Sequence, residues 1–488
     1  MTGVRRVPLL LLILALSVPF AATLGAETPA ALIAPEALRA DLRLARQVIE
    51  QSHPGAYRYE TPAQLAAAFE RAERSAVRPM DAWAFFRCVA TAVASIRCAH
   101  TAVSMPESLQ HDLDTTIPIL PLAVRVLDRH LYVLRDLTQP PVGDLAGDEI
   151  VSVAGIPTAR LLDTLYAALP RDGDVASSDA WRIDGLRLGT HLARVFSLRS
   201  PFTLELRERG GRTRSVAIEG RPRPALVDSL RARFPGDLPP ANALDTGFLD
   251  GGAVARIALH RFSERDSATL VALHRAVAQA FDSVRTRHSR ALILDLRGNG
   301  GGEDELGLAL VSALVSRSFT YYDSLVINPR EFSFAAYVQN QDPIPPGFTV
   351  PRPNGKLAGI QHPNQGTHEP APNHFDGPLF VLMDGRSLST TCEFLSNLEP
   401  RRKATYVGEE AGGAYGGNTS GFTATVRLPN SGLRLFVPQM TYYMAAHGRP
   451  LRRGMLPDVA VQPTIDDLLA GRDPAMTRAV ELARRAAR

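Results

Sequence analysis

Lysine and cysteine are both scarce in this 488-residue chain. Lys356 and Lys403 are its only lysines, so any chemistry that needs a lysine must use one of these two. The three cysteines (Cys88, Cys98 and Cys392) cannot form a disulfide scaffold, because at least one stays unpaired within a monomer. Their spacing matches no zinc motif, and H-E-x-x-H is absent from the sequence. We therefore expect neither a metal site nor a cofactor.

Long apolar runs and basic clusters are also rare. The one long apolar run extends from Pro8 to Phe20, after two arginines and before several small residues. This order is typical of a secretory signal peptide over residues 1–26, and the run is short for a membrane span, which needs about 20 residues. We expect an exported protein, periplasmic or secreted, without an integral span after leader removal; an uncleaved leader would remain as an anchor. No basic run with interleaved aromatics occurs, which argues against a nucleic-acid partner.

Shifts in composition indicate a multi-domain α/β protein. After the leader they divide the chain into five regions: helices over 27–105, short β-strands over 106–225, a proline-rich linker over 226–244, alternating strands and helices over 245–465, and a helical tail over 466–488. The alternation predicts a mostly parallel sheet covered by helices. The stretch 323–376, rich in Pro, Asn, Gln and Gly, predicts a long irregular insertion that borders a substrate cleft.

A glycine-rich turn follows an apolar strand in ALILDLRGNGGGEDELG, residues 291–307. Glycines at such a turn let backbone N–H groups approach a ligand closely, which suits an oxyanion hole or a phosphate cradle. The phosphate interpretation is weak, because neither common phosphate-loop pattern is present and three acidic residues open the following helix. A purely structural tight turn is the remaining alternative.

Two serines precede a predicted helix in MDGRSLSTTCEFLSNL, residues 383–398. A serine at a helix start gains from the helix dipole, and the next backbone N–H can donate to an oxyanion. Serine and threonine are also the usual helix caps, and this segment taken alone favours capping.

Together the two segments resemble the tail-specific (C-terminal-processing) serine protease family. The shared pattern is D-L-R-x-N-x-G-G at a strand end, a serine that opens a helix, and Gly-Glu at residues 408–409 after the next strand. The resemblance is close over 245–465 and implies a crotonase/ClpP-like α/β catalytic domain. In the family the nucleophile precedes an apolar helical residue by five positions and the Gly-Glu pair by nineteen, which selects Ser389 over Ser387. It also implies an oxyanion hole that includes the backbone N–H groups of Thr390 and Gly301.

The same resemblance assigns a general base. Some family members use a lysine twenty-five residues after the serine, but that position is Ala414 here. The chain instead resembles the branch typified by the tricorn core protease, in which a histidine from the N-terminal helical region completes the site. SIRCAHTAV at 95–103 is similar to the segment of that branch that ends in His-Ser or His-Thr, which implies His100.

The acid partner of the histidine stays open. The tricorn branch has a glutamate shortly before a G-x-x-P-D segment, and no acid immediately precedes that segment here, at residues 454–458. Glu409, Glu410, Asp458 and a backbone carbonyl are the alternatives.

GDEIVSVAGIPTARLLDTL at 147–165 resembles the carboxylate-binding half of a PDZ domain. Peptide capture by strand addition and a purely structural β-domain are both consistent with it. The whole pattern predicts an exported serine-type endopeptidase that cleaves peptides or unfolded proteins through an acyl-enzyme on Ser389. The rival is a non-catalytic peptide- or ligand-binding protein that retains the protease scaffold, because function depends on the site and not on the fold.

Overall fold

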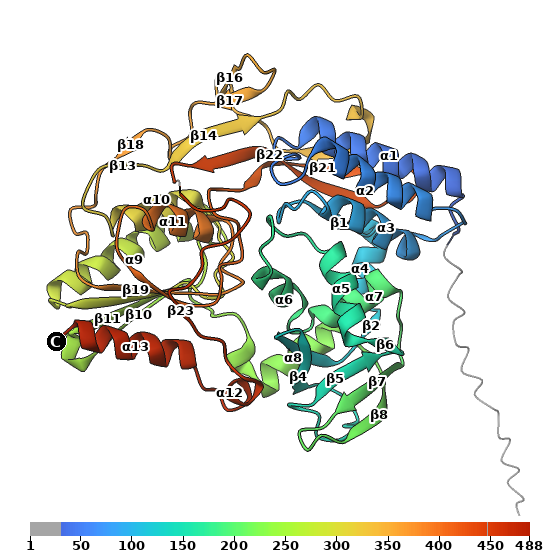
Figure 1. Ribbon diagram of the computed structural model, residues 1–488, viewed down its shortest axis with the longest axis horizontal. Coiled ribbons are helices and arrows are strands. Elements are labelled where there is room, and N and C mark those ends of the chain that lie inside the picture. The colour runs from blue at the N-terminus through green and yellow to red at the C-terminus, as the bar shows by residue number, and fades with distance from the viewer. Residues whose placement is uncertain (1–30, 447) are drawn as a thin grey trace, which may run out of the picture. The chain divides into compact units, whose positions relative to one another are not determined.

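The computed structural model describes residues 31–446 and 448–488 (Figure 1). Residues 32–488 form one compact unit. The leader expected over residues 1–26 lies outside the described residues. Within the described part, none of the helices combines the length and the apolar character that a membrane crossing requires.

Three helices open the described chain, as the sequence predicts: α1 (Pro35–Ser52), α2 (Pro62–Ser75) and α3 (Ala82–Ala94). A capping box between Thr61 and Gln64 starts α2, and the Asp81 side chain caps α3. A turn after α3 carries His100 and leads into β1 (Ala102–Ser104), which pairs antiparallel with β22 (Arg434–Met444). This pairing attaches the histidine-bearing turn to a strand near the end of the chain.

The next region holds a six-stranded sheet of order β3-β4-β5-β7-β8, with β6 beside β5. Its strands are β3 (Leu122–Leu127), β4 (His130–Asp136), β5 (Glu149–Val153), β6 (Ile156–Pro157), β7 (Phe202–Arg207) and β8 (Thr213–Ile218). The segment compared with a PDZ domain forms β5, a turn, β6 and α5 (Thr158–Ala168). Two helices missed by sequence follow, α6 (Ser177–Ile183) and α7 (Arg187–Phe196); both are short, and the Asp184-Gly185 turn interrupts their apolar pattern.

The predicted linker 226–244 is partly wrong, because helix α8 (Arg223–Arg233) occupies its first half. Pro222 directly precedes this helix and Pro224 lies in its first turn, where the missing N–H of a proline costs no hydrogen bond. The prolines that indicated a linker therefore begin a helix. Smaller elements around α8 are α4 (Glu107–Thr115), the paired strands β2 (Pro118–Ile119) and β9 (Arg221–Pro222), and a 3-10 turn, η1 (Pro235–Asp237).

The α/β region contains the predicted mostly parallel sheet, of order β10-β11-β12-β19-β20-β23. Only the β10–β11 pair is antiparallel. The strands are β10 (Leu244–Leu249), β11 (Val254–Leu259), β12 (Ala291–Asp295), β19 (Leu379–Met383), β20 (Thr405–Gly408) and β23 (Val459–Ala460). The helices are α9 (Ser267–Thr286), α10 (Asp304–Ser312), α11 (Thr390–Leu398), α12 (Ile465–Leu469) and α13 (Pro474–Ala486).

Helices cover both faces of this sheet (Figure 1). Leu292 and Leu294 pack in one apolar cluster with α9, α10 and α11, whereas Ala291 and Ile293 pack in another with α13. Since β12 and β19 are parallel neighbours, the turns after their carboxyl ends lie side by side. Those turns are the glycine-rich turn and the serine-bearing turn.

The predicted irregular insertion 323–376 is partly wrong, because short strands within it join a second sheet while the segments between them are irregular. A seven-stranded sheet has the order β15-β21-β22-β14-β17-β16, with β1 on β22. Its further strands are β14 (Tyr322–Ile327), β15 (Val338–Gln341), β16 (Thr349–Pro351), β17 (Leu357–Gly359) and β21 (Thr419–Arg427), while β13 (Phe319–Thr320) pairs with β18 (Thr367–His368). These strands are short and some partners are remote, as in the pairing of Ile327 with Met440, so local patterns did not reveal them.

Candidate active site

Ser389 lies on a sharp turn between β19 and α11. Its backbone has φ 58° and ψ −127°, a conformation that costs a non-glycine residue free energy and is concentrated at functional sites. The carbonyl oxygen of Asn299 holds this turn, since it accepts from the Leu388 N–H at 3.1 Å and from the Thr391 hydroxyl at 3.0 Å. The glycine-rich turn therefore supports the serine turn directly.

The structure distinguishes the two candidate serines. Ser387 is fully buried; its Oγ donates to the Leu296 carbonyl at 2.9 Å and accepts from the Asp384 N–H at 3.1 Å. Ser389 is half-buried, and its hydroxyl has no hydrogen-bond partner among the described residues. Ser387 is thus a structural residue, and Ser389 is the serine that is available to react.

The glycine-rich turn packs directly against Ser389. A Cβ at Gly301, where φ is 95°, would lie 2.7 Å from the Ser389 Cβ. The Gly301 N–H donates to Asn299 Oδ1 at 2.9 Å within its own turn. The Thr390 N–H has no partner among the described residues, so it is the open donor beside the serine. The oxyanion role of Gly301 stays a prediction.

His100 is half-buried at the end of the turn after α3, and its Nδ1 is buried without a hydrogen-bond partner. Burial lowers the pKa of His100, an effect that Arg182 reinforces and Asp172 opposes. The imidazole is therefore neutral near neutral pH, which is the form that can accept a proton.

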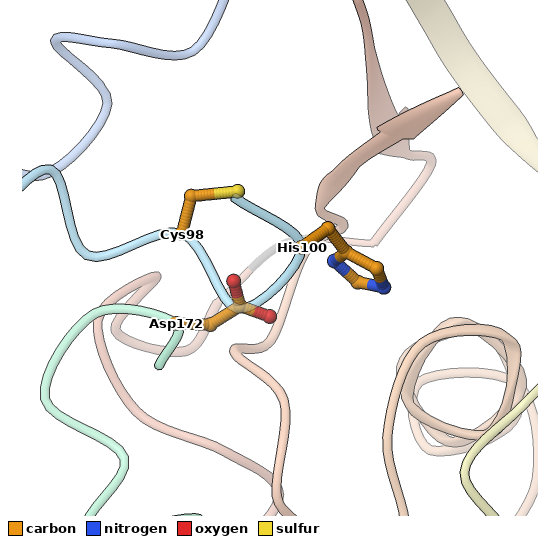
Figure 2. A group of neighbouring side chains, drawn as sticks. All are labelled: Cys98, His100 and Asp172. Atoms are coloured by element: carbon orange, nitrogen blue, oxygen red, sulfur yellow. The ribbon is translucent and has the colours of Figure 1, made fainter. Parts of the chain in front are cut away.

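Asp172, in the loop between α5 and α6, faces the same turn (Figure 2). A ring nitrogen of His100, a carboxylate oxygen of Asp172 and Cys98 Sγ lie within 4.8 Å of one another. Asp172 is 2% exposed; its Oδ1 accepts from the Ala99 N–H at 2.8 Å, and its buried Oδ2 has no partner. Burial raises the pKa of Cys392 on α11, and the Asp172 charge raises it further. The Asp172 charge therefore raises the pKa of His100 and that of Cys392, which lies three residues after Ser389.

The acids considered from sequence have other partners. The nearest cation to Glu409 is Arg125, at 3.8 Å; Glu410 binds Arg453 at 2.8 Å; Asp458 accepts from the Tyr406 N–H at 2.9 Å. None of the three bonds to His100 among the described residues. Sequence reasoning missed Asp172 because nothing in the local pattern RDGD separates it from an ordinary turn aspartate.

The two lysines do not contact Ser389 in the described part of the chain. Lys356 Nζ donates to the Pro54 carbonyl at 3.0 Å, and burial lowers the pKa of this lysine. Lys403 is exposed just before β20. A serine–lysine pair therefore has no support from the geometry.

The cluster of Cys98, His100 and Asp172 contains three possible metal ligands. The Cys98 thiol donates to the Thr419 carbonyl at 3.4 Å, and burial raises the pKa of this thiol to about 12. A metal would have to displace that proton and bind the proposed base, so the donor set suits a neutral thiol beside a histidine better than a resident ion.

Known proteins match this chain at the level of family and fold. None of the curated proteins matches the sequence. Residues 253–461 match the family model for peptidase family S41. The solved structure of mature CPAF complexed with lactacystin shares 16% identity with a TM-score of 0.64, over 92% of this chain and 98% of that one. A CPAF mutant shares 14% identity with a TM-score of 0.62, over 93% and 97%. Residues 253–461, which hold both turns, are therefore similar to peptidase family S41, the two CPAF structures share the fold of the chain, and these findings support a serine-type peptidase.

Proposed function

We propose that the protein is an exported serine endopeptidase that cleaves peptides or unfolded proteins, with Ser389 as nucleophile and His100 as general base. One observation carries the assignment of the base. The unpartnered Nδ1 of the neutral His100 and the unpartnered Oδ2 of Asp172 are both buried, and these side chains approach within 4.8 Å. A carboxylate that accepts from Nδ1–H would hold the tautomer in which Nε2 is free to take the serine proton.

The proposed reaction is acyl transfer in two halves. His100 Nε2 takes the Ser389 proton while Oγ attacks the peptide carbonyl carbon, and the oxyanion accepts from the Thr390 N–H, with a second donor from the glycine turn. The C–N bond then breaks, and the imidazolium returns its proton to the departing amine. Water, deprotonated by His100, attacks the ester carbonyl; the acid leaves and Ser389 regains its proton.

Export is proposed from the leader pattern over residues 1–26 alone. Expression of the full chain in a bacterial host, followed by fractionation and mass determination of the N-terminus, tests it. A mature chain that begins near residue 27 outside the cytoplasm supports export. An intact leader in the cytoplasm contradicts it.

A fluorophosphonate reagent tests the active-site assignment. We expect labelling of the wild type at Ser389, no labelling of Ser389→Ala, and very slow labelling of His100→Ala, because only an activated serine reacts quickly. Ser318→Ala, an exposed serine, is the matched control and should label normally. A folded wild type that stays unlabelled and cleaves no peptide would support the rival, a non-catalytic binding protein.

A further inference from the structure

A cavity of about 560 Å³ lies beside the histidine-bearing turn, between α3, α4, α6 and α7. One part of its wall is apolar, with side chains from α3, α5–α6 and α6–α7: Phe86, Ala90, Val93, Leu169 and Leu186. The other part is basic: Arg182, Arg187, Arg194 and Arg223. Asp114 is the only acidic residue in the lining. We call this space the arginine cavity.

The arginines of this cavity lack ion-pair partners among the described residues. Arg187 donates to the Asp184 carbonyl at 2.9 Å, and Arg182 donates to the Ala99 carbonyl at 3.4 Å. Arg194 Nε donates to His191 Nδ1 at 3.3 Å, and burial holds the pKa of His191 well below its ordinary value, so this partner is neutral. No carboxylate of the described residues forms an ion pair with these three arginines, although Asp172 and Asp179 act on Arg182, Asp184 on Arg187 and Asp114 on Arg194 from a greater distance.

Their environment is unfavourable to the charges they carry. Burial lowers the pKa of Arg187 and of Arg194 to about 10 in each case. A buried cation without a counter-ion costs free energy, and this cost falls when an anion binds beside it. The cavity is wide enough to admit one.

Residues that line the same space carry buried hydrogen-bond donors that have no partner. Thr101 Oγ1, Trp181 Nε1 and Arg182 Nε are buried and have no partner. Indole and guanidinium nitrogens can only donate, so the ligand that would satisfy them must supply acceptors. Buried donors without partners are rare in proteins, and each calls for an explanation such as a missing ligand.

We propose that the arginine cavity binds an organic anion, whose carboxylate or phosphate group contacts the arginines while its apolar body packs against α3. The site is separate from the Ser389 turn, yet Arg182 contacts the Ala99 carbonyl and Thr101 directly follows His100. Occupancy would therefore order the turn that carries the proposed base. The binding itself requires no peptidase chemistry, so it can be tested independently of the proposed function.

Isothermal titration with four probes tests the site: octanoate, octyl phosphate, octanol and inorganic phosphate. We expect saturable binding of octanoate or octyl phosphate, and the tighter of the two identifies the head group. Octanol and inorganic phosphate should bind much more weakly, because octanol has no anionic group and inorganic phosphate has no apolar body. Equal binding of octanol, or no saturable binding of either organic anion at millimolar concentration, would overturn the proposal.

Variants locate the binding. Arg194→Gln should weaken the anion by about 10-fold or more, as expected for a lost charge-assisted hydrogen bond, while its amide can still donate to His191. Arg187→Gln should act similarly and serves if Arg194→Gln unfolds, which thermal unfolding will reveal. Arg317→Gln, an exposed arginine outside the cavity, should bind as the wild type does. Unchanged affinity in both folded cavity variants would refute the assignment.

Discussion

The buried Asp172 carboxylate lies within 4.8 Å of a ring nitrogen of His100. Asp172→Asn keeps an oxygen for the Ala99 N–H but turns an amide N–H₂ toward the imidazole, which favours the tautomer that cannot accept the serine proton. We expect kcat to fall by roughly 10³–10⁴-fold with little loss of stability, by analogy with other buried triad aspartates. Asp163→Asn, which changes an exposed aspartate on α5, is the control and should retain most activity. Full activity of a folded Asp172→Asn variant would exclude Asp172 from the site.

The pH dependence of kcat/KM reports the base. Because burial lowers the pKa of His100, the acid limb should lie below the ordinary histidine value of about 6.5. Asp172 raises that pKa, so its removal should move the limb to still lower pH.

His100→Ala should lose nearly all turnover, whereas Lys356→Ala and Lys403→Ala should remain active. A lysine variant that alone abolishes activity would move the search for the base to that residue.

At the scale of elements, the glycine turn and the serine turn form one packed unit. A Cβ at Gly301 would meet the Ser389 Cβ at 2.7 Å, so Gly301→Val should displace the nucleophile and reduce kcat by about 100-fold or more. Gly300→Ala is a matched control, since a Cβ there meets no atom within 4 Å and the N–H is retained. Steady-state kinetics of the two folded variants tests this prediction. An equal loss of kcat in both would show that any substitution in the turn lowers activity, and would contradict a specific role for Gly301.

Helix α11 carries a buried carboxyl group four residues after the serine. Glu393 accepts from Asn418 Nδ2 at 2.7 Å and from the Tyr322 hydroxyl at 2.9 Å, and burial together with Asp304 raises its pKa to about 8. A raised carboxyl pKa contributes stability below its unfolded value of 4.5, and this contribution is lost as pH rises through about 8. Urea unfolding between about pH 5 and about pH 9 should therefore show falling stability in this range. Glu393→Gln should flatten the slope; an unchanged slope would mean that another group titrates.

At the scale of the whole molecule, the proposed site combines three regions of the chain: the turn after α3, the loop after α5, and the α/β region. Arg452 of the α/β region pairs with Asp174 of the loop at 2.6 Å and with Glu60 at 3.1 Å, and Arg97 of the turn after α3 pairs with the same glutamate at 2.8 Å. Arg452 thereby holds the loop that carries Asp172, and its own carbonyl oxygen accepts from the Asp174 N–H at 2.7 Å.

Arg452→Gln should loosen that loop more than it destabilises the fold. The partly exposed ion pairs are each worth only about 0.2–1 kcal/mol, so the free energy of unfolding should change little. We expect kcat to fall several-fold because the Asp172 carboxylate loses its fixed position. Arg478→Gln, which removes a surface pair with Glu481, is the control for charge loss. Kinetics that match the control would show that Arg452 does not position the site.

The sequence determined the parallel α/β region and the glycine turn, because strand and helix periodicity and short motifs are local properties, and its resemblance to a family led to the prediction of Ser389. It did not reveal the second sheet as a whole, because most of its strands are short and β14 pairs with the remote β22. It also could not reveal Asp172, whose hydrogen bond to the Ala99 N–H joins residues 73 positions apart. Only the tertiary structure brings that carboxylate to the histidine, since the contact depends on how a β-rich region packs against a helix end and not on any pattern along the chain.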